Sequence, residues 1–173
     1  MLILMAGLPA SGKSTLSRAA AAAIHAAGER AAVVLDKDRL RAEMFSSDDI
    51  EYSRQQNDRV MSAIYARAAE ILAREPRAIV FIDGRPFART EQLHEAILRA
   101  HEIGTPWKII ECVCSDASAR LRLSAPHLAR DRDYALRRRI AAEWQPITFS
   151  KVLIDTDLPL ATCVERLLEY LRA

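Results

Sequence analysis

The chain has few of the features that assign a protein to a class at once. It has only three cysteines, Cys112, Cys114 and Cys163, and the first two stand one residue apart in an apolar run. This spacing matches neither a metal-binding motif nor a disulfide framework, so we expect reduced thiols in the core. No stretch approaches ~18 consecutive apolar residues, and no basic segment precedes a long apolar one near the first residue. The sequence therefore predicts a cytoplasmic protein that does not enter a membrane.

An excess of charge of one sign is also lacking. The chain has 25 Lys and Arg against 23 Asp and Glu, which leaves a net charge of +2. A protein that wraps long nucleic acid is expected to be far more basic. With 173 residues, 50% of them hydrophobic, the chain can bury one core but is too short for two ordinary domains. We predict a single domain over residues 1–173.

The most informative feature present is a loop between an apolar run and an Ala-rich run. Residues 7–15 read Gly-Leu-Pro-Ala-Ser-Gly-Lys-Ser-Thr, which is a complete phosphate-binding loop or Walker A motif. Its two glycines allow backbone conformations closed to other residues, so that N–H groups can turn inward around a phosphate at the positive end of a helix. Lys13 would reach the β- and γ-phosphates and Ser14 a Mg²⁺ ion. The expected nucleotide-binding residues here are Gly7, Pro9, Ala10, Ser11, Gly12, Lys13, Ser14 and Thr15.

Apolar, β-branched runs alternate with helical patterns along the chain. The expected strands are 2–6, 31–35, 78–82, 107–113 and 151–154, and the expected helices are 13–27, 38–45, 53–74, 89–103, 116–123, 133–143 and 160–171. Such alternation predicts an α/β fold of three layers, a five-stranded, mainly parallel sheet with helices on both faces. Ligands of such a fold gather at the carboxyl ends of the strands.

Carboxylates stand at the ends of two strands beside the phosphate-binding loop. Asp36 ends the second predicted strand, and Asp83 ends the third. Mg²⁺ prefers oxygen ligands. We therefore expect Asp36, Asp83 and Ser14 to form the metal site.

The segment Asp36-Lys37-Asp38, followed by Arg41, distinguishes a kinase from a plain nucleotide hydrolase. If a helix begins near Asp38, then Asp38 and Arg41 lie one turn apart on the same face. Asp38 could accept a proton from an acceptor hydroxyl, and Arg41 could hold an anionic group or the transferring phosphoryl. The alternative is that Asp38 only caps the helix and Arg41 is solvated.

With these motifs the chain resembles the small P-loop kinases related to phage polynucleotide kinase, zeta toxins, chloramphenicol phosphotransferase and the shikimate or gluconate kinases. The resemblance covers most of the chain and implies the P-loop NTPase kinase fold with a helical lid. It places the hydroxyl-activating base at Asp38 and matches Arg41 to an arginine of polynucleotide kinase. The Asp-x-Asp pattern of shikimate kinases puts Asp36 near the metal and Asp38 on the substrate.

The third strand end adds a second resemblance. Asp83-Gly84 looks like the Asp-Gly segment of adenylate kinases, but Arg85 stands where an aromatic residue normally follows. This departure argues against nucleoside monophosphate specificity. Arg85 and Arg89 could contact the acceptor, and Arg89 could equally be an exposed residue in the first turn of a helix.

An arginine-rich segment follows Asp116 around Pro126, and by position it resembles the lid of the same kinases, at about residues 120–135. A mobile lid would exclude water and bring guanidinium groups to the transferred phosphoryl. The resemblance places Arg120 near the adenine and Arg130 or Arg132 over the phosphates, with Arg130 favoured. The alternative is that these arginines form surface ion pairs. We expect that alternative for Arg137, Arg138 and Arg139.

Together these features predict a kinase that uses ATP and Mg²⁺ and transfers the γ-phosphoryl to a hydroxyl of a small-molecule acceptor. The expected catalytic residues are Lys13, Asp38, Arg41 and Arg130, and the expected substrate-binding residues are Asp38, Arg41, Asp83 and Arg85. A polynucleotide 5′-hydroxyl kinase and a regulatory ATP-binding module without kinase activity are the alternatives.

Overall fold

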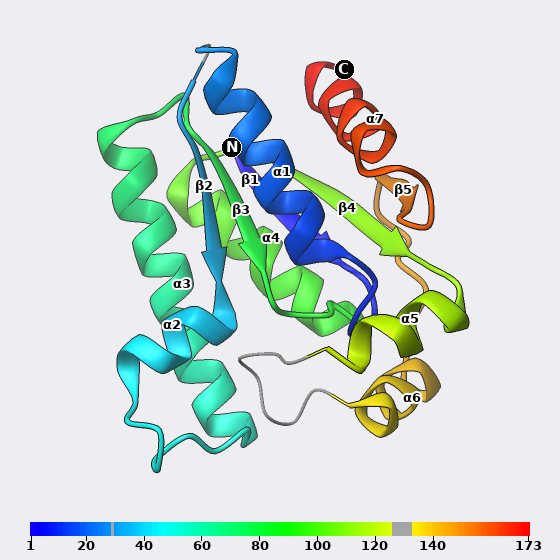
Figure 1. The fold of residues 1–173 in the computed structure, drawn as a ribbon. Coiled ribbons are helices and arrows are strands. Elements are labelled where there is room, and N and C mark those ends of the chain that lie inside the picture. The colour runs from blue at the N-terminus through cyan, green and yellow to red at the C-terminus, as the bar shows by residue number, and fades with distance from the viewer. Residues whose placement is uncertain (29, 126–132) are drawn as a thin grey trace.

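A computed structural model describes residues 1–28, 30–125 and 133–173 (Figure 1). Its centre is a five-stranded sheet in the order β2-β3-β1-β4-β5, and every neighbouring pair of strands is parallel. The strands are β1 (Leu2–Ala6), β2 (Ala32–Asp36), β3 (Ile79–Asp83), β4 (Trp107–Val113) and β5 (Lys151–Asp155). The predicted α/β fold is confirmed, and the sheet is entirely rather than mainly parallel.

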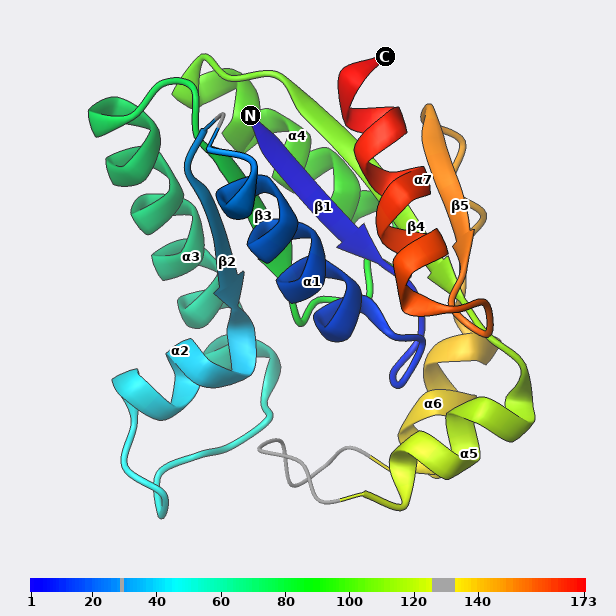
Figure 2. The same cartoon turned by 45° about the horizontal axis from the view of Figure 1, so that its top comes forward.

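Helices cover both faces of the sheet (Figures 1 and 2). One face carries α1 (Lys13–Ala26) and α7 (Leu160–Arg172), and the other carries α3 (Arg54–Arg74) and α4 (Thr90–Ile103). Three shorter helices, α2 (Lys37–Met44), α5 (Asp116–Leu123) and α6 (Tyr134–Ala142), lie at the end to which the strands point. The predicted element ranges differ from the observed ones by at most one residue at either end.

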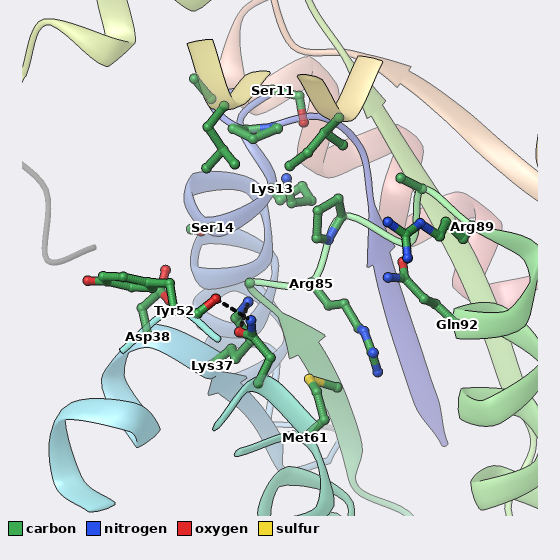
Figure 3. Close-up of a pocket in the computed structure, with 18 of the residues that line it drawn as sticks. Ser11, Lys13, Ser14, Lys37, Asp38, Tyr52, Met61, Arg85, Arg89 and Gln92 are labelled. Atoms are coloured by element: carbon green, nitrogen blue, oxygen red, sulfur yellow. Dashed lines mark hydrogen bonds between the residues drawn. The ribbon is translucent and has the colours of Figure 1, made fainter. Parts of the chain in front are cut away.

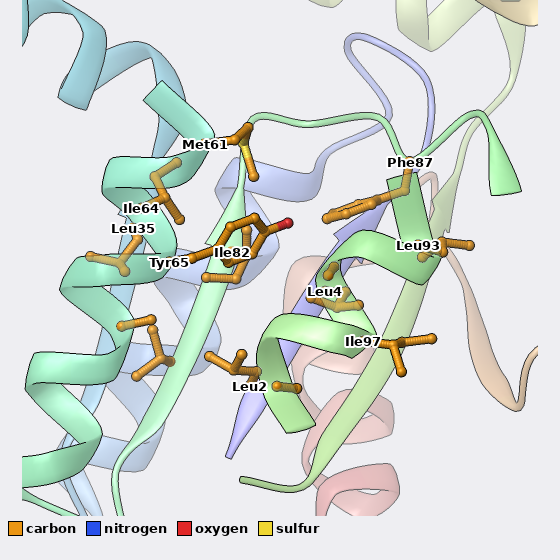
Figure 4. Packing of buried hydrophobic residues seen from close by; sticks show 14 of the residues in the cluster. Leu2, Leu4, Leu35, Met61, Ile64, Tyr65, Ile82, Phe87, Leu93 and Ile97 are labelled. Atoms are coloured by element: carbon orange, nitrogen blue, oxygen red, sulfur yellow. The ribbon is translucent and has the colours of Figure 1, made fainter. Parts of the chain in front are cut away.

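The central strand β1 is buried at all of its positions and serves both faces. Because successive side chains of a strand point to opposite faces, Leu2 and Leu4 pack with α3 and α4, whereas Ile3 and Met5 pack with α1 and α7 (Figure 4). Full burial of each such side chain stabilises the fold by roughly 1.5–3 kcal/mol. This buried strand fixes the start of the phosphate-binding loop, which follows directly at Gly7.

The remaining features of the fold concern the cysteines and the membrane. All three cysteines are free thiols: Cys112 and Cys163 are buried, and Cys114 is half-buried. Burial raises the pKa of Cys112 to about 12. Among the helices described, none combines the length and the apolar character needed to cross a bilayer. The cytoplasmic location and the single domain stay predictions.

Candidate active site

The loop between β1 and α1 owes its shape to two glycines. Gly7 has a φ of +136° and Gly12 a φ of +86°, both in the region that favours glycine. Space is a second constraint, because a Cβ on Gly7 would collide with the Cys112 carbonyl and one on Gly12 would come within 2.9 Å of the Thr156 side chain. The chain therefore places glycine where neither strain nor bulk is tolerated.

The carbonyl groups at the start of this loop are held by Lys13. Its ammonium donates to the carbonyl oxygens of Gly7 at 2.7 Å and Leu8 at 2.9 Å. Leu8 also accepts from the Ser11 N–H at 3.1 Å. Lys13 is nearly buried at 8% exposure. The side chain expected at the phosphates thus closes the loop on itself in this structure.

The next three carbonyls are held from other elements by Arg122, Arg137 and Thr156, which we call the loop brace. Arg137 of α6 donates to the Pro9 oxygen at 2.6 Å, and Arg122 of α5 donates to the Ala10 oxygen at 3.2 Å. The Thr156 hydroxyl, after β5, donates to the Ser11 oxygen at 2.9 Å. The backbone carbonyls of residues 7–11 are thus all occupied, which fixes the path of the loop.

The loop brace shows that one prediction is wrong, includes Thr156, for which no role was predicted, and places Arg122 of the predicted lid segment on the loop backbone. Arg137 is buried, so the expectation that it forms a surface ion pair is wrong. Arg122 also donates to the Thr156 hydroxyl at 2.9 Å and to the Thr156 carbonyl at 2.7 Å. No local pattern points to the contacts with the loop, since Arg122, Arg137 and Thr156 are 112 residues or more from the carbonyls that they hold.

Asp83 lies at the carboxyl end of β3 and is fully buried. Desolvation raises its pKa, although the Ser14 hydroxyl and the Lys13 ammonium act in the opposite direction. Neither carboxylate oxygen accepts a hydrogen bond of standard geometry from the residues that the structure describes. A buried carboxylate that lacks such donors, next to a serine hydroxyl, is a donor set that suits Mg²⁺.

Asp36 neighbours Asp83 in the register of β2 and β3 but has a different environment. Its carboxylate accepts from the backbone N–H groups of Asp38 at 2.9 Å and Arg39 at 3.2 Å and thereby caps α2. The other oxygen pairs with Arg18 at 2.7 Å. Because both oxygens are occupied, these contacts argue against the prediction that Asp36 binds metal. They also show that the alternative in which Asp38 only caps the helix is wrong, because the N-cap residue of α2 is Asp36.

Asp38 and Arg41 meet as the spacing predicts. The Arg41 guanidinium donates to the Asp38 carboxylate at 2.7 Å and to the Asn57 side-chain oxygen at 2.5 Å, and it lies 4.8 Å from the centre of the Tyr52 ring. Arg41 is 1% exposed, so the alternative that it is solvated is wrong. Asp38 keeps 19% of its side chain exposed and lines the cavity. Figure 3 shows Asp38 and Tyr52 on one side of the cavity.

Arg85 and Arg89 line the same cavity and are both paired with carboxylates. Arg85 contacts Glu95 at 2.9 Å and Asp58 at 3.7 Å. Arg89 contacts Glu143 at 2.6 Å. Figure 3 shows Arg89 next to Gln92, with Arg85 between this pair and Lys37. Contact of either arginine with an acceptor stays a prediction, and Arg89 is an exposed residue at the start of α4, as the alternative expected.

Of the lid arginines Arg120, Arg130 and Arg132, only Arg120 lies among the described residues. Arg120 is exposed, pairs with Asp116 at 2.8 Å and packs on the Tyr134 ring, and it is not among the residues that line the cavity. The structure therefore does not bring Arg120 to the predicted adenine position. Arg130 and Arg132 lie outside the described residues, so their role and the lid itself stay predictions.

These side chains border a single open cavity of about 1060 Å³. One side consists of the loop and the first turn of α1, with Pro9, Ala10, Ser11, Gly12, Lys13, Ser14 and Thr15. The other side contains Asp38, Arg41 and Arg85, whereas Gly7, Asp36 and Asp83 are not at its surface. The volume is slightly above the roughly 300–1000 Å³ of ordinary ligand pockets. The phosphate-binding loop and the Asp38–Arg41 pair thus share one space.

Comparison with known proteins gives a family and a fold. The family model described as AAA domain matches residues 2–142. No curated protein matches the chain in sequence. Among solved structures, the APS kinase of Mycobacterium tuberculosis in complex with AMPPNP and APS has a TM-score of 0.73 at 17% identity, with 99% of this chain and 97% of that chain covered. Kti12 of Chaetomium thermophilum in complex with ADP-AlF3 has a TM-score of 0.71 at 17% identity, with 98% of each chain covered. A gluconokinase from Sinorhizobium meliloti has a TM-score of 0.63 at 17% identity, with 98% and 94% covered.

Proposed function

The chain belongs to the AAA domain family of the P-loop NTPase superfamily, and from this premise we propose that it is a cytoplasmic kinase that transfers the γ-phosphoryl of ATP to a hydroxyl of a small molecule. The observation that carries the proposal is the shared cavity, in which the phosphate-binding loop faces the Asp38–Arg41 pair. The shared cavity of about 1060 Å³ also has room for a second ligand between the loop and this pair, which hydrolysis by water would not require. The solved kinases of similar fold support this assignment.

On this proposal the loop binds the triphosphate through backbone N–H groups and through Lys13, which exchanges the Gly7 and Leu8 carbonyls for phosphate oxygens. Ser14 and Asp83 would hold Mg²⁺, and the buried Asp83 carboxylate without standard hydrogen bonds is the observation that fits a cation. When bound, Mg²⁺ neutralises the negative charge on the phosphate oxygens. Lys13 adds a second positive charge on the same side of the cavity.

Asp38 is the proposed base. The acceptor oxygen forms a bond to the γ-phosphorus while the bond from this phosphorus to the β,γ-bridging oxygen breaks, and the acceptor proton passes to the Asp38 carboxylate. Arg41 is a positioning residue in this scheme, since it is buried and holds one Asp38 oxygen at 2.7 Å. The proposal assigns the other Asp38 oxygen to the acceptor. Arg130 stays the predicted lid arginine.

The test is the variant Asp38→Asn. It removes the base and leaves the phosphate-binding loop intact, so acceptor phosphorylation should fall about 10²–10⁴-fold while the ATP dissociation constant changes less than about twofold. Acceptor-dependent ADP release gives the first quantity, and calorimetric titration with ATP gives the second. Asp48→Asn, at an exposed position beyond α2, is the matched control.

Two results would contradict the proposal. Full phosphorylation by Asp38→Asn would remove Asp38 from the chemistry. ADP release that no pool of small hydroxyl compounds stimulates would point away from a small-molecule kinase. Stimulation by a 5′-hydroxyl oligonucleotide alone would then favour the polynucleotide kinase, and stimulation only by a protein partner would favour the regulatory module.

A further inference from the structure

The cavity wall away from the phosphate-binding loop has an unusual balance of charge. We call the lining residues between 37 and 95 the acceptor wall. Its cationic side chains are Lys37, Arg41, Arg54, Arg85 and Arg89. Its carboxylates are Asp38, Asp58, Glu91 and Glu95, and Glu143 lines the cavity beside Arg89. The wall itself thus has five cationic groups and four carboxylates, and beside it Glu143 and Arg139 of the α6 segment add one charge of each sign.

The arginines of the acceptor wall are also paired. Arg41 is held by Asp38, and Arg85 is held by Glu95 at 2.9 Å and by Asp58 at 3.7 Å. The Arg85 side chain is only 12% exposed, whereas its partners Glu95 and Asp58 are 39% and 55% exposed. An anionic acceptor would have to displace a carboxylate from such a guanidinium and then lie beside that carboxylate. Both steps cost free energy, so the wall selects against negative charge.

Hydrogen-bonding groups on the wall favour a ligand that carries many donors. The carboxylates of Asp38 and Glu95 can accept from hydroxyl or amino groups. The Gln92 side-chain oxygen is buried and finds no donor among the described residues. An uncharged hydroxyl both donates and accepts, so it can bind to either member of an ion pair without separating the two. The Tyr52 ring, which lines the same space, adds a flat apolar surface.

We propose that the acceptor is a polyhydroxy compound, uncharged or carrying amino groups, and not a phosphorylated, sulfated or carboxylated one. This inference rests on the proposed kinase function and specifies its substrate class. A sugar, a cyclitol, a nucleoside or an aminocyclitol meets the description. The end of a nucleic acid does not, because each nucleotide brings a phosphodiester charge to the wall.

The experiment compares two matched pools of compounds. One pool contains hexoses, inositols, nucleosides and aminocyclitols, and the other contains phosphate, sulfate or carboxylate derivatives that keep an equivalent hydroxyl. Transfer of labelled phosphate from ATP is measured for each pool at equal concentration. The neutral and amino pool should be phosphorylated about tenfold faster or more, equivalent to about 1.4 kcal/mol.

Faster phosphorylation of the anionic pool overturns this inference and leaves the proposed kinase function standing. Phosphorylation of neither pool by protein that still binds ATP overturns the proposed function, and this inference with it. The two failures are therefore distinguishable.

A charge variant tests the physical cause. Glu95→Gln removes the nearest carboxylate from Arg85, so the preference for the neutral pool should fall about threefold or more. Glu102→Gln on the same helix is the matched control, because Glu102 pairs with Arg99 at 2.8 Å and does not line the cavity. An equal change in both variants would overturn the argument from the paired guanidinium. Melting temperatures of both variants establish that they are folded.

Discussion

The loop brace predicts a measurable effect of a single hydroxyl. In Thr156→Val a methyl group replaces the hydroxyl that donates to the Ser11 carbonyl at 2.9 Å and accepts from Arg122 at 2.9 Å. The change in shape is small, so the loss is almost entirely of hydrogen bonds. A partly buried group that loses its partner costs about 1–3 kcal/mol. In a chain of this size each kcal/mol lowers the melting temperature by about 2–4 °C, so a fall of about 4–8 °C is expected for the middle of that range.

The same substitution should weaken ATP binding, because a loosened loop must be ordered when the phosphates bind. We expect the ATP dissociation constant to rise about three- to tenfold, and tenfold corresponds to about 1.4 kcal/mol. Thermal unfolding and calorimetric titration measure the two effects. Thr148→Val, at an exposed position before β5, is the control. If Thr156→Val changes neither quantity more than this control does, Thr156 does not hold the loop and the reasoning is refuted.

Three further predictions concern other parts of the site. Burial raises the pKa of Asp83 above its usual value of 3.8, so ionisation of its carboxylate destabilises the fold as the pH rises above that value. Without nucleotide, Asp83→Asn should therefore melt at a higher temperature than the original protein at pH 7.5, and this difference should shrink toward pH 4. The same variant should bind Mg-ATP more weakly. A dependence of the melting temperature on pH that is the same in both proteins would contradict this reasoning. Arg137→Ala should lower both the melting temperature and ATP affinity, whereas Arg138→Ala on the same helix should change neither, as differential scanning fluorimetry with and without ATP can measure. With a thiol reagent at pH 8, the half-buried Cys114 should react quickly while Cys112, whose pKa burial raises to about 12, should react only on unfolding.

Local patterns in the sequence predicted the elements and the loop. The strands and helices were predictable because the alternation of apolar residues changes period between strand and helix, and each period is a property of a few neighbouring residues. The Asp38–Arg41 pair was predictable for the same reason, since a spacing of three places both on one face of a helix.

The contacts between distant segments were not predictable in this way. The sequence predicted metal binding for Asp36 and offered a helix cap only as the alternative for Asp38, and it is the contacts of α2 and Arg18 that identify Asp36 as the cap. The arginines 137–139 are distributed around one helix, and the position of α6 against the loop selects Arg137 for burial. Thr156 carries no recognisable motif, because its partner is a backbone carbonyl 145 residues away.

The family resemblance ends at residue 142, but the support of the phosphate-binding loop does not. A truncated polypeptide that stopped there would retain each signature by which a nucleotide-binding protein is recognised. It would lose the edge strand β5 and with it the only described side chain that anchors the Ser11 carbonyl. The segment that can be identified by its motifs is therefore smaller than the unit that evolution must keep intact for the motif to function.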